Sequence, residues 1–144
     1  MDMIKDCTTL EQGRMLVGLG IDQDTADKCW IAVETGEEKP ALYSLSLEQA
    51  RENRMTADRF LTDIARKSVP DALTPAWSLT ALLDLLPAEI GNGGVNYPLC
   101  LAKTGSGYRA YYARETGLLY STMDECPVGA AVKMIFLLKE KNIL

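Results

Sequence analysis

Two apolar stretches decide the fold of this chain: Pro75-Ala-Trp-Ser-Leu-Thr-Ala-Leu-Leu-Asp-Leu-Leu-Pro87 and Cys126-Pro-Val-Gly-Ala-Ala-Val-Lys-Met-Ile-Phe-Leu-Leu138. In the first, Ser78 is a favoured N-cap residue and Pro87 cannot continue a helix, so a helix is predicted between them. The second begins at Pro127, whose missing amide proton costs nothing at the first helical position. Apolar residues recur in both stretches at the spacing of one helix face: Leu79, Leu82, Leu83 and Leu86, then Val128, Ala131, Val132, Ile135 and Leu138. We therefore predict two helices that form two walls of one core.

The sequence between these helices favours a β-meander. Runs rich in β-favouring residues occupy 98–103, 108–114 and 118–121, and glycine-containing turns separate them. The glycine-rich segment 91–94 is predicted as a loop that precedes the first strand. These glycines are not expected to bind phosphate, because phosphate-binding loops lead from a strand into a helix.

The first half of the chain carries signals for further short elements. Thr9-Leu-Glu-Gln12 is a capping box, so a helix is predicted from Leu10. Residues 24–27 are predicted to form a single capped turn that runs to about Cys29, and residues 30–35 and 41–45 are predicted to pair as a β-hairpin.

A second capping box, Ser46-Leu-Glu-Gln49, predicts a helix that reaches about Val69 before Pro70. Residues 69–75 are then predicted to be a turn-rich connector.

Together these patterns predict a single α+β domain over residues 1–144, with a small, mostly antiparallel sheet packed against about four helices. At 144 residues and 47% hydrophobic composition, the chain is long enough to bury one core. Within it, residues 73–144 form the predicted helix-meander-helix core, and residues 37–70 form a variable insert.

Composition argues against several classes of function. The chain has no histidine, so Ser/His/Asp and Cys/His catalysis are excluded, and its four cysteines show no CxxC spacing for zinc. We expect no cofactor and no metal. The net charge of -5 does not favour general binding to nucleic acid, although a local basic surface is compatible with it. No secretion signal is visible and Lys133 interrupts the longest apolar segment, so we expect a cytoplasmic protein without membrane contact.

Cys126 is the one candidate nucleophile. The positive end of the predicted helix behind it favours a thiolate, whereas Asp124 and Glu125 beside it oppose one. A structural or helix-capping role is the favoured interpretation, and we predict no catalytic residue.

The candidate binding residues fall in two places. In the strand over 108–114, alternation puts Tyr108, Ala110, Tyr112 and Arg114 on one face and Arg109, Tyr111 and Ala113 on the other. One face must pack on the helices, and the other displays aromatic and cationic groups. The second place is the helix over 47–67, whose outward side carries basic residues. The binding candidates are Tyr108, Arg109, Tyr111, Tyr112, Arg114, Arg51, Arg54 and Arg59.

Each of these surfaces also has simpler explanations. Tyr and Arg side chains at the edge of a core explain the strand, and a solvated helix face with pairs such as Arg54 with Asp58 explains the helix. Protein partners, self-association and stacking of single-stranded bases remain open for the Tyr and Arg face.

The order of motifs resembles a family of small uncharacterised proteins of intestinal anaerobic bacteria and their prophages. The resemblance rests on Thr9-Leu-Glu-Gln12, the Pro75-Ala-Trp-Ser-Leu element, the β-meander and the C-terminal apolar helix. It covers roughly residues 8–28 and 73–144, whereas residues 37–67 depart from the pattern. It implies an α+β fold and a mobile-element origin, and it implies no activity, cofactor or catalytic residue.

The favoured function is a non-enzymatic accessory or binding protein that acts through contacts with an unknown protein partner or as a homo-oligomer. Two alternatives stay open. One is a nucleic-acid-associated factor that uses the Arg-rich helix or the Tyr face, and the other is a small enzyme with a Cys and carboxylate site.

Overall fold

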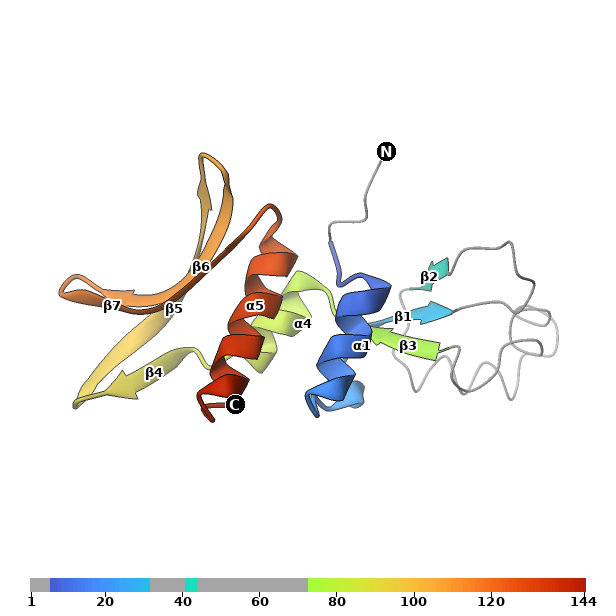
Figure 1. The fold of residues 1–144 in the computed structure, drawn as a ribbon, viewed down its shortest axis with the longest axis horizontal. Coiled ribbons are helices and arrows are strands. Elements are labelled where there is room, and N and C mark those ends of the chain that lie inside the picture. The colour runs from blue at the N-terminus through green and yellow to red at the C-terminus, as the bar shows by residue number, and fades with distance from the viewer. Residues whose placement is uncertain (1–5, 32–40, 44–72) are drawn as a thin grey trace. The chain divides into compact units, whose positions relative to one another are not determined.

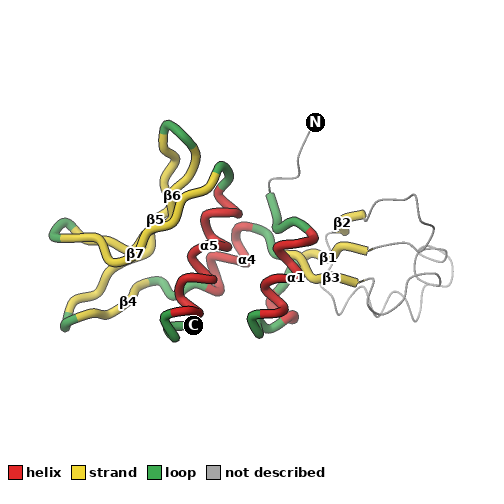
Figure 2. Tube along the Cα trace, viewed as in Figure 1, coloured by secondary structure: helices red, strands yellow, loops and turns green. Residues whose placement is uncertain are grey.

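The computed structural model describes residues 6–31, 41–43 and 73–144, which belong to two compact units (Figure 1). Met1–Thr8 and Leu79–Leu144 form one unit, and Thr9–Ser78 form the other. Both units combine helices with antiparallel strands, as the secondary-structure colouring in Figure 2 shows. The predicted α+β class is therefore confirmed.

The unit that contains the C-terminus is built on a four-stranded antiparallel sheet with strand order β4-β5-β6-β7. Its elements are α4 (Leu79–Leu85), β4 (Glu89–Asn92), β5 (Val95–Thr104), β6 (Gly107–Arg114), β7 (Gly117–Asp124) and α5 (Pro127–Glu140). Helix α5 packs against β6, β7 and α4. In Figure 1 both helices lie on one side of the sheet, so the sheet has one face toward the helices and one face away from them.

Strand β4 was not predicted from the sequence, which indicated only a loop over residues 91–94. The loop is a tight turn between two paired strands, because φ is 63° at Gly93 and 80° at Gly94. Two consecutive positive φ angles match a hairpin turn of the I′ type, and glycine adopts them at no steric cost. Residues 89–92 therefore pair with β5 and form an edge of the sheet.

Helix α5 follows its prediction closely. It begins at Pro127 and buries every residue of the predicted stripe, and Met134 is buried as well. Its N-cap position, Cys126, makes no side-chain capping hydrogen bond. Helix α4 buries Leu82, and the residue that follows its last turn, Leu86, is also buried.

The second unit holds α1 (Leu10–Gly18), the 3-10 turn η1 (Gln23–Thr25) and a three-stranded antiparallel sheet with strand order β2-β1-β3. The predicted capping box is confirmed, because the Gln12 amide donates to Thr9 Oγ1 at 3.1 Å and the Thr9 amide donates to Gln12 Oε1 at 2.9 Å. A single turn is present, but it is η1, which begins one residue earlier than predicted and is capped by Asp22. The predicted extension of the turn to about Cys29 is wrong, because β1 begins at Lys28. The predicted hairpin pairs β1 (Lys28–Ile31) with β2 (Ala41–Tyr43).

The connector predicted over residues 69–75 is wrong at its C-terminal end, because β3 (Leu73–Ala76) pairs with β1. Pro75 is compatible with this strand because β3 lies at the edge of its sheet, where a missing amide proton costs no ladder bond. Trp77 follows the strand and is fully buried, and its indole Nε1 donates to Thr25 Oγ1 at 2.9 Å. Ser78 donates its amide and its hydroxyl to the Asp27 carboxylate.

The described residues contain three α-helices and two sheets, where about four helices around one small sheet were predicted. The helix predicted from Ser46 to about Val69 lies outside the described residues. So do the candidate binding residues Arg51, Arg54 and Arg59.

Gly13 on α1 allows the closest approach in the second unit. A Cβ at this position would collide with the carbonyl oxygen of Pro75 on β3 and press on Thr74 Cγ2. We predict that Gly13→Ala lowers the free energy of unfolding of this unit by about 1–3 kcal/mol. Gly18, in the same helix, has nothing within 4 Å of a built Cβ. Gly18→Ala is therefore the matched control and should raise stability by up to about 1 kcal/mol.

Urea unfolding followed by tryptophan fluorescence measures both variants, since Trp77 is buried in this unit. Equal stability of the two variants would show that α1 does not pack on β3 as described.

Candidate functional site

The register of the sheet sorts the predicted site residues into two faces. Tyr112 lies between Leu99 of β5 and Tyr120 of β7. Thr122 shares this face because it is opposite Ala110, and its hydroxyl donates to the Ala130 carbonyl of α5 at 2.8 Å. This is therefore the inner face, which packs on the helix.

Tyr112 belongs to the core, although the sequence placed it among the binding candidates. Its side chain is fully buried, and its hydroxyl donates to the Pro87 carbonyl at 2.7 Å. Burial raises the pKa of Tyr112 to about 12, because the charged phenolate would be separated from water. Its role is packing and hydrogen bonding inside the unit.

Tyr108 and Arg114 alternate onto the same face of β6 as Tyr112, and they lie at the two ends of the strand. Tyr108 is half-buried and lies opposite Asp124 of β7. Arg114 is exposed, and its Nη1 donates to the Asn96 carbonyl at 2.9 Å. A register irregularity between Tyr112 and Ala113 precedes it. The structure therefore separates these residues from one another instead of gathering them into one site.

Arg109 and Tyr111 form the centre of the face that points away from the helices. The guanidinium carbon of Arg109 lies 4.8 Å from the centroid of the Tyr111 ring. The Arg109 Nε donates to Ser121 Oγ at 2.7 Å. A cation above an aromatic face is attracted to it, and the hydrogen bond fixes the orientation of the guanidinium. The arginine is thus held in one orientation.

Met123 completes this face, because it lies opposite Arg109 on β7 and is 45% exposed. Sequence reasoning missed it because the third strand was predicted to end at Ser121, whereas β7 continues to Asp124. The alternation that continues from Ser121 to Met123 was the available signal. We call the group Arg109, Tyr111, Ser121 and Met123 the outer patch.

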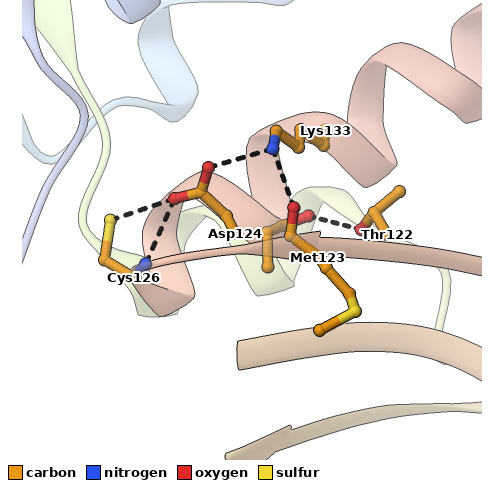
Figure 3. Close-up of polar contacts among 6 residues, drawn as sticks. Thr122, Met123, Asp124, Cys126 and Lys133 are labelled. Carbon is orange, nitrogen blue, oxygen red and sulfur yellow. Dashed lines mark hydrogen bonds and ion pairs between the residues drawn. The ribbon is translucent and has the colours of Figure 1, made fainter. Parts of the chain in front are cut away.

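A second polar cluster joins β7 to α5 and contains Cys126 (Figure 3). The Asp124 carboxylate lies between Lys133 Nζ, at 3.1 Å from Oδ1, and Cys126, whose amide and thiol donate to Oδ2 at 3.1 and 3.4 Å. Lys133 Nζ also donates to the Met123 carbonyl at 2.7 Å. These contacts tie the end of β7 to the first two turns of α5.

The electrostatics of this cluster favour an ionised Asp124. Desolvation raises the pKa of Asp124, but the hydrogen bonds from the Cys126 amide, Lys133 and the Cys126 thiol outweigh it, so the pKa lies below its usual value. The Cys126 thiol donates to this ionised carboxylate, so the contact holds the thiol proton between the sulfur and Oδ2.

Neither a metal centre nor a spanning helix is found among the residues that the structure describes. No three Cys, Asp or Glu side chains in this part of the chain gather closely enough to hold a metal ion. Over the same residues, no helix has the length and hydropathy to cross a bilayer.

Comparison with protein-family models, with curated proteins and with solved structures found no match for this chain. The resemblance to proteins of intestinal bacteria and prophages stays a prediction.

Tyr112→Phe tests the buried hydroxyl. Loss of the hydrogen bond to the Pro87 carbonyl should lower the free energy of unfolding at neutral pH by about 1 kcal/mol. Because the folded-state pKa is raised, the stability from Tyr112 is fully present below about pH 10 and is lost as the pH rises toward 12.

The wild type should therefore lose stability between these pH values more steeply than Tyr112→Phe, as measured by urea unfolding followed by circular dichroism. Parallel alkaline profiles would contradict a buried Tyr112.

Asp124→Asn tests the cluster of Figure 3. A lowered carboxylate pKa means that Asp124 stabilises the fold above its ordinary pKa and that this contribution is lost as the pH falls. At neutral pH the substitution should cost about 0.5–1 kcal/mol, as expected for a partly exposed pair. The cost should shrink below about pH 4, where the wild type also protonates. A cost in urea unfolding that is the same at pH 7 and pH 3 would show that the charge of Asp124 is not what matters.

Proposed function

We propose that this chain is a non-enzymatic binding protein and that a protein partner docks on the outer patch. One observation carries the proposal: on the sheet face that no described element of this unit covers, Arg109 is stacked on Tyr111 and held by Ser121. In Figure 1, α4 and α5 lie on the opposite side of the sheet, and no described element of this unit covers the outer face.

The chemistry of the patch fits recognition of a protein. Arginine and tyrosine are enriched among the residues that dominate binding energy at interfaces, and methionine is enriched in interface cores. The Arg109 side chain loses little conformational freedom on binding because its position is already fixed. Exposed apolar surface at Met123 and Leu118, 45% and 52% exposed, flanks these groups and adds area that is buried in a complex.

The resemblance to prophage-encoded proteins indicates where the partner of this proposal is to be sought. A mobile-element origin would make proteins of the host or of the element itself the candidates for the partner. The partner is therefore sought among the proteins of the cell that carries the gene.

Binding of single-stranded nucleic acid is a second candidate, because a half-buried Tyr ring with an Arg beside it offers a surface on which a base can stack. The net charge of -5 opposes it, since a polyanion must overcome the repulsion of the whole chain. An enzyme based on Cys126 is disfavoured by the carboxylate that faces the thiol.

Arg109→Ala and Tyr111→Ala are the variants that test the proposal. Each should weaken binding to the partner by at least about tenfold, which is typical of residues at the centre of an interface. Arg114→Ala is the matched control, because Arg114 is an exposed arginine of the same strand that lies outside the outer patch.

The measurement begins with capture of proteins from the native cell by the wild type and by each variant, compared by quantitative mass spectrometry. Titration of the purified partner by calorimetry follows. Equal binding by all variants would overturn the proposed role of the outer patch.

A labelled oligothymidine, titrated at low salt, separates the alternative. If the oligothymidine binds, needs Tyr111 for binding and dissociates steeply as salt rises, the ligand of the outer patch is a nucleic acid and not a protein.

A further inference from the structure

The two edges of the four-stranded sheet differ in how they are protected. Strand β4 is short, with four residues, and carries the charge of Glu89. Strand β7 has eight residues, Gly-Leu-Leu-Tyr-Ser-Thr-Met-Asp, and no charged side chain before Asp124. Natural sheets usually guard a long edge with charge, proline or a covering element, because an unguarded edge pairs with other strands. Such guards are missing from most of β7.

The hairpin between β5 and β6 shows which backbone groups of β7 face outward. A two-residue turn joins Thr104 to Gly107, and the pair that closes such a turn is hydrogen-bonded. Hydrogen-bonded and non-hydrogen-bonded pairs alternate from there, so Arg109 and Tyr111 bond to β5 while Ala110 and Tyr112 bond to β7. The partners of Ala110 and Tyr112 are Thr122 and Tyr120. The backbone groups of Ser121 and Met123 consequently point to the open edge.

The contact of Lys133 agrees with this direction. Its Nζ donates to the carbonyl oxygen of Met123. If this oxygen pointed toward β6, a hydrogen bond of the β6–β7 ladder would occupy it instead. A carbonyl oxygen has two lone pairs, so this contact leaves Met123 able to accept a further hydrogen bond. The amide and carbonyl of Ser121 have no such contact with Lys133 and lie at the centre of the edge.

We propose that a second copy of this chain pairs with β7 through the same edge, antiparallel and about a two-fold axis at Ser121. An antiparallel strand is complementary to itself, because a two-fold rotation brings donors opposite acceptors. In this register Ser121 lies opposite Ser121 of the second copy, and Thr122 lies opposite Tyr120 of the second copy, within the regular part of β7. The two sheets then form one continuous sheet.

Charge favours a second copy over a charged partner strand. Two molecules of net charge -5 repel one another, but β7 brings no charged side chain to the axis. At the end of the strand, Asp124 is paired with Lys133 within its own molecule at 3.1 Å. Pairing along β7 therefore places the uncharged stretch of this strand against the same uncharged stretch of the second copy.

Apolar surface and free space also fit this arrangement. Leu118 and Met123 are 52% and 45% exposed, and the two-fold axis brings the Met123 end of one strand beside the Leu118 end of the other. An open hollow of about 400 Å³ borders Leu119 and Tyr120 of β7, and its other walls are Pro87, Ile143 and residues of β4. Free space therefore adjoins this end of β7.

Pairing of one short strand is a small interface compared with the roughly 1,200–2,000 Å² of a stable complex. We therefore expect a reversible dimer that forms at concentrations of about 10 µM to 1 mM. The dimer displays two outer patches on one sheet. The dimer depends on the backbone edge of β7, whereas the proposed function depends on the Arg109 and Tyr111 side chains, so each can fail without the other.

Sedimentation equilibrium of the full chain over this concentration range is the test. The wild type should shift from the monomer mass toward twice that mass. Ser121→Pro removes an amide that points to the open edge and leaves the hydrogen bonds to β6, so it should abolish the shift. Ser121→Ala keeps that amide and is the matched control that should still dimerise.

Met123→Glu provides a second test that does not alter the backbone, at a position that is already exposed. It places a negative charge near the axis and should weaken dimerisation at least about tenfold, with recovery at high salt. Tyr111→Ala should dimerise like the wild type, because its backbone bonds to β5.

A wild type that stays monomeric throughout the range overturns the proposal. So does a dimer that persists in Met123→Glu and in a folded Ser121→Pro, with folding checked by circular dichroism.

Discussion

The packing of α5 against the inner face of β6 and β7 is the constraint on which the rest of this unit depends. Helix α5 presents an apolar stripe that includes Ala131, Val132 and Ile135, all buried. The Thr122 hydroxyl anchors the sheet to the helix backbone at Ala130. Because successive residues of a strand point to opposite faces, this packing forces Arg109 and Tyr111 outward. The composition of the outer face is thus a consequence of the core.

The elements with strong local signals could be predicted from the sequence. Pro127 marks the start of α5, and Thr9 with Gln12 marks the start of α1. Strand β3 could not be predicted, because Leu-Thr-Pro-Ala has the composition of a turn and becomes a strand only by pairing with β1, which is distant in sequence. The same holds for β4, whose Glu-Ile-Gly-Asn gains its strand character from β5. Tertiary pairing decides such segments, and local propensity does not.

Only part of the candidate site could be predicted, because the rest also depends on tertiary pairing. Alternation correctly divides β6 into two faces, but both faces carry tyrosine and arginine, so composition does not say which one packs on the helix. Tyr112 is the inner residue because its hydroxyl reaches the Pro87 carbonyl. The pairing of Arg109 with Ser121 depends on the register of β7, which no pattern within one strand reveals. Cys126 shows the opposite case, since the contact with its sequence neighbour Asp124 is local and could be foreseen from the sequence.

The most direct test of this arrangement compares two adjacent tyrosines of the same strand. Hydroxyl-radical footprinting with tandem mass spectrometry measures the solvent accessibility of Tyr111 and Tyr112 separately in the native protein, and denatured protein gives the intrinsic reactivity of each. If α5 covers the inner face, Tyr111 is oxidised readily and Tyr112 is protected until the protein unfolds. Equal oxidation of both tyrosines in the native protein, or protection of Tyr111 with oxidation of Tyr112, would contradict the assignment of the two faces.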